Sequence, residues 1–379
     1  MHKLKVYTED NTSAALKNIP LEPMVHPFFK ERITNVNKRN LDALRYDRYW
    51  HAPSSPFTFS CLEECDLVIL PYDWYWVRGP HWKYPVNSPV AKEVKRINTQ
   101  LYYKAREYQK PVAVFFRGDR SHESIPLKEA IVFREGLYQS RRSAHDFALP
   151  AFSEDIAPQW SSQHTNIRPK QPKPTVGFCG LVGTWKLKQL AGLGAYQALM
   201  LATQGRLDAS PYKGEILRTK ALATLQQHQG IETNFILRQE SVFLGRADDE
   251  SREKHRNEYV QNLRSSDYIL CCRGSGNFSF RFYETLCMGR IPVLINTDCV
   301  LPFDSQIDWR NHAVWVEEKE LHRLPEKILE FHNSLSPQEF TNLQIECRRL
   351  WEKWLAPEGF FANFYHHFEP LLSHHLIRL

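Results

Sequence analysis

Residues 267–295 read DYILCCRGSGNFSFRFYETLCMGRIPVLI, and this stretch decides the fold. An apolar run ends at Cys272, a loop with two glycines follows, a helix is expected over 280–288, and a second apolar run covers 291–295. Strand, loop, helix and strand in this order predict one βαβ unit of a parallel sheet. Ligands bind at the carboxyl ends of such strands, so the glycine loop is the first place to look for a site.

Short apolar runs alternate with helical patterns through the rest of the chain, which is typical of α/β layering. We expect strands at 4–7, 66–70, 112–116, 130–133, 175–179, 234–237, 267–272, 291–295 and 313–316. We expect helices at 89–108, 252–264, 280–288 and 339–354. The predicted fold class is α/β, with two Rossmann-like domains.

A proline-rich segment, SSQHTNIRPKQPKP at 161–174, separates the two halves. Proline blocks helix propagation and favours an extended chain, so a domain boundary is expected here. The predicted division is an amino-terminal domain at 1–165, a linker at 166–174 and a carboxyl-terminal domain at 175–350. A helical tail at 351–379 is expected to pack back on the first domain.

Composition and charge narrow the function classes. The 379 residues are 42% hydrophobic and 24% charged, which are globular values, and the net charge of +6 is too small for a dedicated nucleic-acid binder. Such a charge suits either a diphosphate ligand or association with an anionic membrane surface. No signal-peptide-like or 18-residue apolar run is seen, and the 8 cysteines form no CxxC pair. We therefore expect a cytoplasmic protein with reduced, mostly buried thiols and no metal site.

The glycine loop and the helix after it carry the chemistry. Gly274 and Gly276 would let backbone amides approach a phosphate, and Ser279 is the expected N-cap of the helix. Arg281 falls in the first helical turn, where it could reach the same anion. Glu284 lies three residues further on the same face and could accept hydrogen bonds from ribose hydroxyls. The alternative is a simple Arg281–Glu284 pair within the helix.

The longer run CCRGSGNFSFRFYETLCMGRIPVLINTDCVLPFDSQIDW, residues 271–309, resembles the signature region of the exostosin family of glycosyltransferases. The shared features are a Cys-x-Arg-Gly loop, Arg and Glu three apart in a helix, Gly-x-x-Pro-Val, Leu-Pro-Phe and a downstream Asp-Trp. The strong match covers about 246–320, and a fainter one includes ECDLVILPY at 64–72.

This resemblance implies a GT-B fold, with two Rossmann-like domains facing each other across a cleft, the donor on the second and the acceptor on the first. It implies inverting transfer of a hexose or pentose from a UDP- or GDP-sugar to a glycan or polysaccharide, without a tightly held metal. By the same resemblance Arg281 would neutralise the diphosphate, Glu284 would hold the ribose, and Arg273 and Asn277 would complete the donor loop. Because no membrane anchor is seen, the chain resembles the soluble bacterial branch of this family.

An inverting transfer needs a general base, which we expect at a strand end of the first domain. Asp73 follows the predicted strand at 66–70, and Asp119 follows the one at 112–116. Asp119 is favoured slightly because His122 is near, although a solvated aspartate in a turn explains either residue equally well.

Four further residues are candidates for ligand contacts. Trp74 and Trp76 could form the floor of the acceptor site, or pack an ordinary loop. Gly180, after the strand at 175–179, could line the diphosphate. Arg246 could bind the same diphosphate or lie on a basic surface.

Three function classes remain open from the residues. The leading one is a glycosyltransferase whose partners are a nucleotide sugar and a glycan, with no nucleic acid. The second is a non-catalytic carbohydrate-binding protein with a transferase-like fold. The third is another nucleotide-binding Rossmann enzyme, such as an NAD-dependent oxidoreductase, but the first half lacks the expected GxGxxG.

Overall fold

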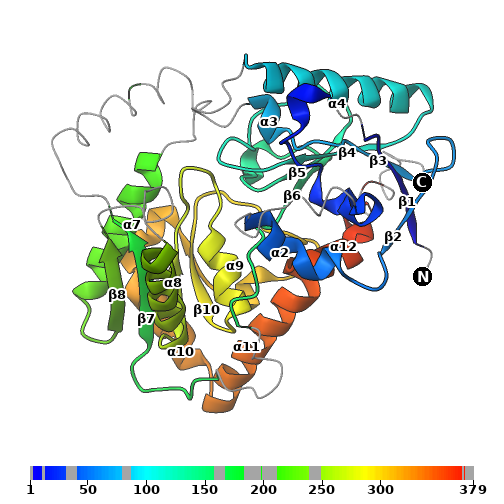
Figure 1. Cartoon of the computed structure of the whole chain (residues 1–379). Coiled ribbons are helices and arrows are strands. Elements are labelled where there is room, and N and C mark those ends of the chain that lie inside the picture. The colour runs from blue at the N-terminus through cyan, green and yellow to red at the C-terminus, as the bar shows by residue number, and fades with distance from the viewer. Residues whose placement is uncertain are drawn as a thin grey trace. The chain divides into compact units, whose positions relative to one another are not determined.

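The computed structural model describes residues 3–10, 13–30, 41–78, 87–157, 167–182, 198, 211–238, 249–368 and 371. The chain divides into two compact units (Figure 1). Unit 1 consists of Met1–Glu154, Val300–Phe303 and Lys353–Leu379, and unit 2 of Asp155–Cys299 and Asp304–Glu352.

Unit 1 is built on six short parallel strands in the order β2-β1-β3-β4-β5-β6. The strands are β1 (Leu4–Tyr7), β2 (Phe57–Phe59), β3 (Leu67–Ile69), β4 (Val112–Phe116), β5 (Ile131–Arg134) and β6 (Asp146–Ala148). The helices are η1 (Ala14–Leu16), η2 (Pro23–Phe28), α2 (Leu41–Trp50), α3 (Tyr75–Arg78), α4 (Pro89–Glu107), η3 (Gln139–Arg141), α12 (Pro357–Ala362) and η7 (Phe364–His367).

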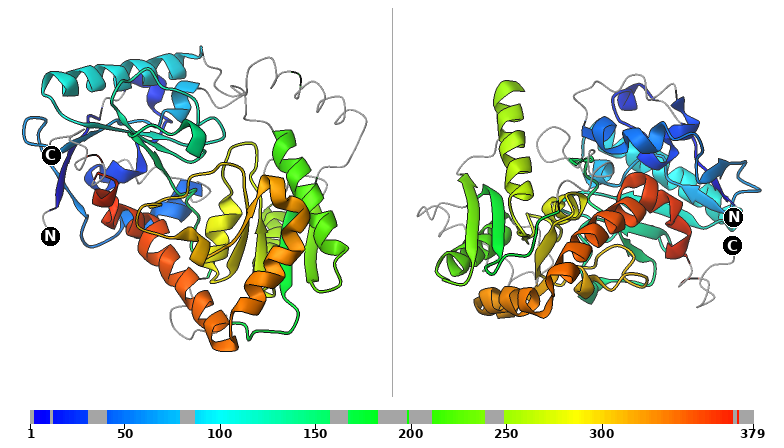
Figure 2. Two further views of the ribbon diagram at one scale, coloured as in Figure 1. Left: turned by 180° about the vertical axis from the view of Figure 1, so that it is seen from behind. Right: turned by 90° about the horizontal axis from the view of Figure 1, so that it is seen from below.

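The sheet of unit 1 is covered on both faces, as a parallel sheet requires. The long helix α4 begins at the N-cap Ser88 and buries an apolar stripe that includes Val94, Ile97 and Leu101. Helices α2 and α12 lie on the other side of the strands (Figures 1 and 2). There the ring of Phe133 stacks 4.8 Å from that of Phe364, so the tail at 353–379 completes the core of unit 1.

Unit 2 is built on five parallel strands in the order β11-β10-β9-β7-β8. The strands are β7 (Thr175–Leu181), β8 (Glu232–Arg238), β9 (Tyr268–Cys271), β10 (Ile291–Asn296) and β11 (Val314–Glu317). The helices are α7 (Pro211–Gln226), α8 (Asp249–Arg264), α9 (Phe280–Cys287), η4 (Trp309–Asn311), η5 (Glu318–Arg323), α10 (Leu324–Ser334) and α11 (Pro337–Leu350). Helix η6 (Trp351–Leu355) begins in unit 2 and ends in unit 1.

The core of unit 2 lies where α7, α10 and α11 meet one face of the sheet. It joins strand residues such as Phe178 and Val293 to Leu222, Ile328 and Phe340 of these helices. Helices α8 and α9 contact strands β7 to β10 but add no residue to this cluster, so they cover the opposite face. Two all-parallel, helix-covered sheets confirm the predicted α/β class with two Rossmann-like domains.

The proline-rich segment is part of unit 2 and not a free linker. The unit boundary lies at 154/155, eleven residues before the predicted 165/166. The backbone N–H of Arg168 donates to Gln344, its Nε lies 2.6 Å from an Asp267 carboxylate oxygen, and Lys170 donates to the Leu335 carbonyl. Proline keeps this segment extended, and its polar groups then bind along unit 2.

His367 is buried in unit 1 between the rings of Phe303 and Phe133, and its Nε2 has no hydrogen-bond partner. Burial, with the charge of Arg142, lowers the pKa of His367 to about 3. Between pH 6.5 and 3 the unfolded chain binds a proton that the folded chain refuses, so stability falls as the pH falls. We expect His367 to lower the free energy of unfolding by about 2 kcal/mol at pH 5 relative to pH 7.5.

Urea unfolding at these two pH values tests the assignment. His367→Phe keeps an aromatic ring and should lose this part of the pH dependence, whereas His366→Gln on the same turn should keep it. Equal pH dependence in the wild type and His367→Phe would contradict the assignment.

No helix within the described ranges is long and apolar enough to cross a membrane.

Candidate functional site

The most informative site of unit 2 lies at the carboxyl ends of β7 and β9. The chain leaves β7 for β8 on one side of it and later returns to β9 on its other side, so β7 and β9 flank the topological switch point of the sheet. Open parallel sheets bind ligands at such points. The glycine loop after β9 and the start of α9 lie here, as the sequence predicted.

Arg281 extends from the first turn of α9 to the end of β7. Its Nη2 donates to the Cys179 carbonyl at 2.7 Å, and its guanidinium carbon lies 4.5 Å from the centre of the Phe178 ring. A Cβ at Gly180 would lie 2.7 Å from Nη2 of Arg281, so glycine leaves room for the end of this side chain. The structure thus brings together Gly180 and Arg281, two of the predicted donor residues.

Arg218 of α7 is a second guanidinium at this place, and sequence reasoning missed it. Its Nη1 donates to the Leu181 carbonyl at 2.5 Å, and its guanidinium carbon lies 5.9 Å from the Phe178 ring centre. Burial and the charge of Arg281 lower the pKa of Arg218.

The two arginines form a cationic pair that is suited to an anion. The Nε atom of each is buried without a hydrogen-bond partner, and neither arginine forms an ion pair with a carboxylate in the part of the chain that the structure describes. Two like charges on one aromatic ring are unfavourable unless an anion joins them. Guanidinium groups bind phosphate through several charge-assisted hydrogen bonds, so a diphosphate fits this arrangement.

Glu284 lies one helical turn beyond Arg281 and is held by a neighbouring helix. The hydroxyl of Tyr259, on α8, donates to Oε2 of Glu284 at 2.5 Å. The predicted alternative, an ion pair between Arg281 and Glu284, is not formed. Burial lowers the pKa of Arg281, but nearby acidic groups that include Glu284 outweigh it, so this pKa lies above its ordinary value.

Arg273 and Asn277 stabilise the glycine loop through hydrogen bonds. Arg273 is buried and donates to the Ser275 carbonyl at 2.8 Å and to Oδ1 of Asn277 at 3.3 Å. Oδ1 of Asn277 also accepts the Thr297 hydroxyl at 2.6 Å. Both side chains thus hold the conformation of the loop, and their predicted contact with the donor stays a prediction.

The loop residues Gly274, Gly276 and Ser279 have different surroundings. The Gly274 N–H donates to the Phe278 carbonyl at 3.2 Å, so this amide closes the loop and does not point to a phosphate. A Cβ on Gly274 would meet nothing within 4 Å, whereas Gly276 is buried. Ser279 occupies the N-cap position of α9, but its side chain makes no capping hydrogen bond.

In unit 1 charged groups gather where β3, β4 and β5 end. Arg117 follows β4 and donates to Oδ2 of Asp73 at 2.6 Å and to both carboxylate oxygens of Glu22 at 2.6 and 2.7 Å. Oδ1 of Asp73 accepts the backbone N–H groups of Tyr75 and Arg117. Burial raises the pKa of Asp73 although Arg117 opposes this rise. Both oxygens of Asp73 are therefore occupied, which argues against the predicted role of Asp73 as general base.

Glu135 comes directly after β5 in the same group, and sequence reasoning missed it. It is 7% exposed, and its Oε2 accepts the Gly118 N–H at 2.6 Å. Gly118 has a φ of +85°, and a Cβ there would lie 3.1 Å from the Tyr75 ring, so glycine shapes this turn. Burial raises the pKa of Glu135 to about 7, against the Gly118 N–H and Arg117. A carboxyl with this pKa can exchange a proton at neutral pH.

The other predicted residues occupy less decisive positions. Asp119 is partly exposed on the turn that follows Arg117. Trp74 is 2% exposed, so it packs within the protein, which favours the predicted alternative of ordinary packing. Trp76 is partly exposed and meets Tyr75 edge-to-face at 5.5 Å. Arg246 lies outside the described residues.

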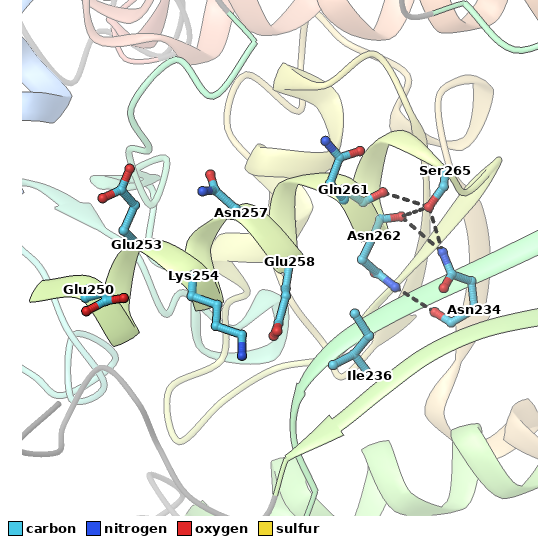
Figure 3. Close-up of a pocket in the computed structure, with 10 residues that line it drawn as sticks. All are labelled: Asn234, Ile236, Glu250, Glu253, Lys254, Asn257, Glu258, Gln261, Asn262 and Ser265. Atoms are coloured by element: carbon cyan, nitrogen blue, oxygen red, sulfur yellow. Dashed lines mark hydrogen bonds between the residues drawn. The ribbon is translucent and has the colours of Figure 1, made fainter. Parts of the chain in front are cut away.

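A separate hollow of about 690 Å³ lies between α8 and the edge strand β8 (Figure 3). Asn234 and Ile236 line it from β8, and residues of α8 such as Lys254 and Glu258 line it from the other side. Oγ of Ser265 and the Asn234 amide nitrogen are 2.9 Å apart at one end. Arg218, Arg281 and Glu284 do not line this hollow, so it is not the anion site.

The fold and the anion site thus define unit 2 as a Rossmann-like α/β unit with a switch-point site. Residues 199–331 match the family model of the Exostosin GT47 domain. Exostosin-1 of Drosophila melanogaster is 37% identical over 111 residues, 29% of this chain and 14% of that protein. The Exostosin-1 homolog of Caenorhabditis elegans is 35% identical over 103 residues, 27% of this chain and 26% of that protein.

These matches confirm the predicted resemblance to the exostosin family over this part of the chain. The matched stretch spans 14% to 26% of the length of these two relatives. Among solved structures, TarM aligns with 68% of this chain and 55% of that chain, at a TM-score of 0.31 and 10% identity.

Proposed function

We propose that this protein is an inverting glycosyltransferase that takes a hexose or pentose from a UDP- or GDP-sugar and transfers it to a glycan or polysaccharide. The pair of partly buried guanidinium groups, Arg218 and Arg281, supports this proposal most strongly. Such a pair suits the diphosphate of a sugar nucleotide, and Glu284 lies one turn further, where a ribose would follow. Arg218, Arg281 and Glu284 all lie within residues 199–331, which match the Exostosin GT47 domain.

The two arginines also suit the leaving group of the reaction. As the acceptor oxygen bonds to the anomeric carbon, the bond from that carbon to the diphosphate oxygen breaks, and the diphosphate leaves with the electron pair. Arg218 and Arg281 would stabilise the negative charge that develops there. We therefore propose that no tightly bound metal is needed, and transfer should persist in the presence of EDTA.

The acceptor hydroxyl must lose its proton in the same step. We propose Glu135 as the group that takes it, in preference to Asp73, because both oxygens of Asp73 are held by hydrogen bonds. Asp119 stays a second candidate, and Trp76 remains our proposed contact for the acceptor. A cytoplasmic location and peripheral association with a membrane are also proposals.

Nucleotide binding is the direct test. Thermal unfolding should be shifted upward by UDP or by GDP, and a panel of UDP- and GDP-sugars should reveal which donor is hydrolysed slowly without acceptor. Binding without turnover of any donor would favour the non-catalytic carbohydrate-binding alternative. Failure of both nucleotides to bind would reject the proposed function.

Glu284→Gln gives a sharper prediction. Gln has one acceptor oxygen and no charge, so it should hold ribose hydroxyls less well. We expect nucleotide affinity to fall 10-fold or more, at about 1.4 kcal/mol per decade. Titration calorimetry measures this fall, with the exposed Glu330→Gln as a matched control that should bind like the wild type. Unchanged affinity in Glu284→Gln would remove Glu284 from the site.

A further inference from the structure

Tyr259 connects two helices at the edge of the anion site. It lies on α8, and its hydroxyl donates to Oε2 of Glu284 on α9 at 2.5 Å. Burial and the neighbouring Glu284 charge raise the pKa of Tyr259 well above its ordinary value. The hydroxyl therefore stays protonated at neutral pH, and it acts as the donor in this bond.

This hydrogen bond fixes the orientation of the Glu284 carboxylate. A glutamate side chain on a helix surface samples several rotamers, and ordering it on binding costs free energy. A carboxylate has about four acceptor positions, and Tyr259 uses one of them. The other acceptor positions of the Glu284 carboxylate then point in fixed directions. Two adjacent ribose hydroxyls can donate to a carboxylate that is held in this way.

The adjacent cation does not compete for this carboxylate. Arg281 is three residues before Glu284 on the same helix, a spacing that often gives an internal ion pair. Here Nη2 of Arg281 donates to the Cys179 carbonyl, and its guanidinium lies over Phe178. The cation is thus directed to the diphosphate position, while Tyr259 holds the carboxylate one turn away.

We propose that Tyr259 is a positioning residue that sets Glu284 for the ribose, and that the pair makes the site selective for ribonucleotides over 2′-deoxyribonucleotides. This inference rests on the proposed function. Without the tyrosine hydroxyl the carboxylate loses a hydrogen bond that orients it, so the second ribose hydroxyl contributes less to binding. The diphosphate contacts of Arg218 and Arg281 do not depend on Tyr259.

The test compares three ligands by titration calorimetry. They are the nucleotide that the wild type binds more tightly, UDP or GDP, its 2′-deoxy form, and inorganic pyrophosphate. In Tyr259→Phe we expect ribonucleotide affinity to fall about 5- to 10-fold and the ribo-to-deoxyribo preference to approach one, with unchanged pyrophosphate affinity. Tyr268→Phe is the matched control, because it removes a buried hydroxyl bonded to His332 in the same unit.

Each outcome decides the proposal. A wild-type ribo-to-deoxyribo preference in Tyr259→Phe would overturn it, and so would equal losses for all three ligands, which indicate a general disturbance. If Tyr259→Phe does not fold, Glu284→Asp replaces it, because the shorter side chain withdraws the carboxylate from Tyr259 and should lose the same preference. If the wild type binds neither nucleotide, the proposed function fails first, which distinguishes the two failures.

Discussion

Arg281→Met is expected to weaken nucleoside diphosphate binding about 100-fold, or about 2.7 kcal/mol, because it removes a charge-assisted phosphate contact from a partly buried position. The stability of the free protein should change far less. The variant loses the bond to the Cys179 carbonyl, but it also removes the repulsion between Arg281 and Arg218.

Ligand-induced stabilisation makes this contrast measurable. At a ligand concentration of 100 times the wild-type Kd, binding should stabilise the wild type by about 2.7 kcal/mol and Arg281→Met by about 0.4 kcal/mol. Arg323→Met removes a half-exposed arginine of the same unit that is paired with Glu330, so it should behave like the wild type. A normal ligand shift in Arg281→Met would place the diphosphate elsewhere.

Much of the fold could be predicted because strong local patterns decide it. Strands 4–7 and 112–116 and the helix that begins at Pro89 lie where apolar runs and helical periodicity placed them. The three-residue strands β2 and β6 were missed, because each is too short to show a period. Proline shows only that a chain is extended, so the sequence could not show that Arg168 and Lys170 bind along unit 2.

The site was predicted only where its residues lie close together in sequence. Arg281 and Glu284 are three apart on one helix, so their shared face could be inferred. Arg218 is 63 residues earlier and Tyr259 is 25 residues before Glu284, and only the sheet topology brings them together. Arg273 was predicted as a donor residue from the Cys-x-Arg-Gly loop, and the sequence could not show that it also donates to the Ser275 carbonyl.

Glu135 could have been found from a rule already applied. The carboxyl ends of adjacent parallel strands meet at one edge, and this rule selected Asp73 and Asp119. Glu135 was missed because its strand was expected to end at 133, two residues before it. In the structure Arg134 is buried against Asp146, and Glu135 is left at the strand end.

Glu135→Gln is expected to lower the transfer rate 10²- to 10⁴-fold, the usual contribution of a general base. The groups that face Glu135 are Arg117, Asp73, Arg45 and Tyr75. In the wild type the rate should rise with pH through about 7, as Glu135 loses its proton, and then level off. The residual rate of Glu135→Gln should lack this rise, because glutamine does not titrate. Nucleotide affinity should not change.

Glu135→Gln should raise the stability of the protein while it lowers the transfer rate. This combination separates a catalytic role of Glu135 from a structural one. The folded pKa of Glu135 is raised, so its contribution to stability is full below pH 4.5 and is lost as the pH rises to about 7. Glutamine avoids burying a charge, so at pH 8 Glu135→Gln should be more stable by up to about 3 kcal/mol. Glu129→Gln, at an exposed residue before β5, should change neither property. A variant that is both more stable and nearly inactive fits a buried base, whereas a rate above one tenth of the wild type in Glu135→Gln would exclude it.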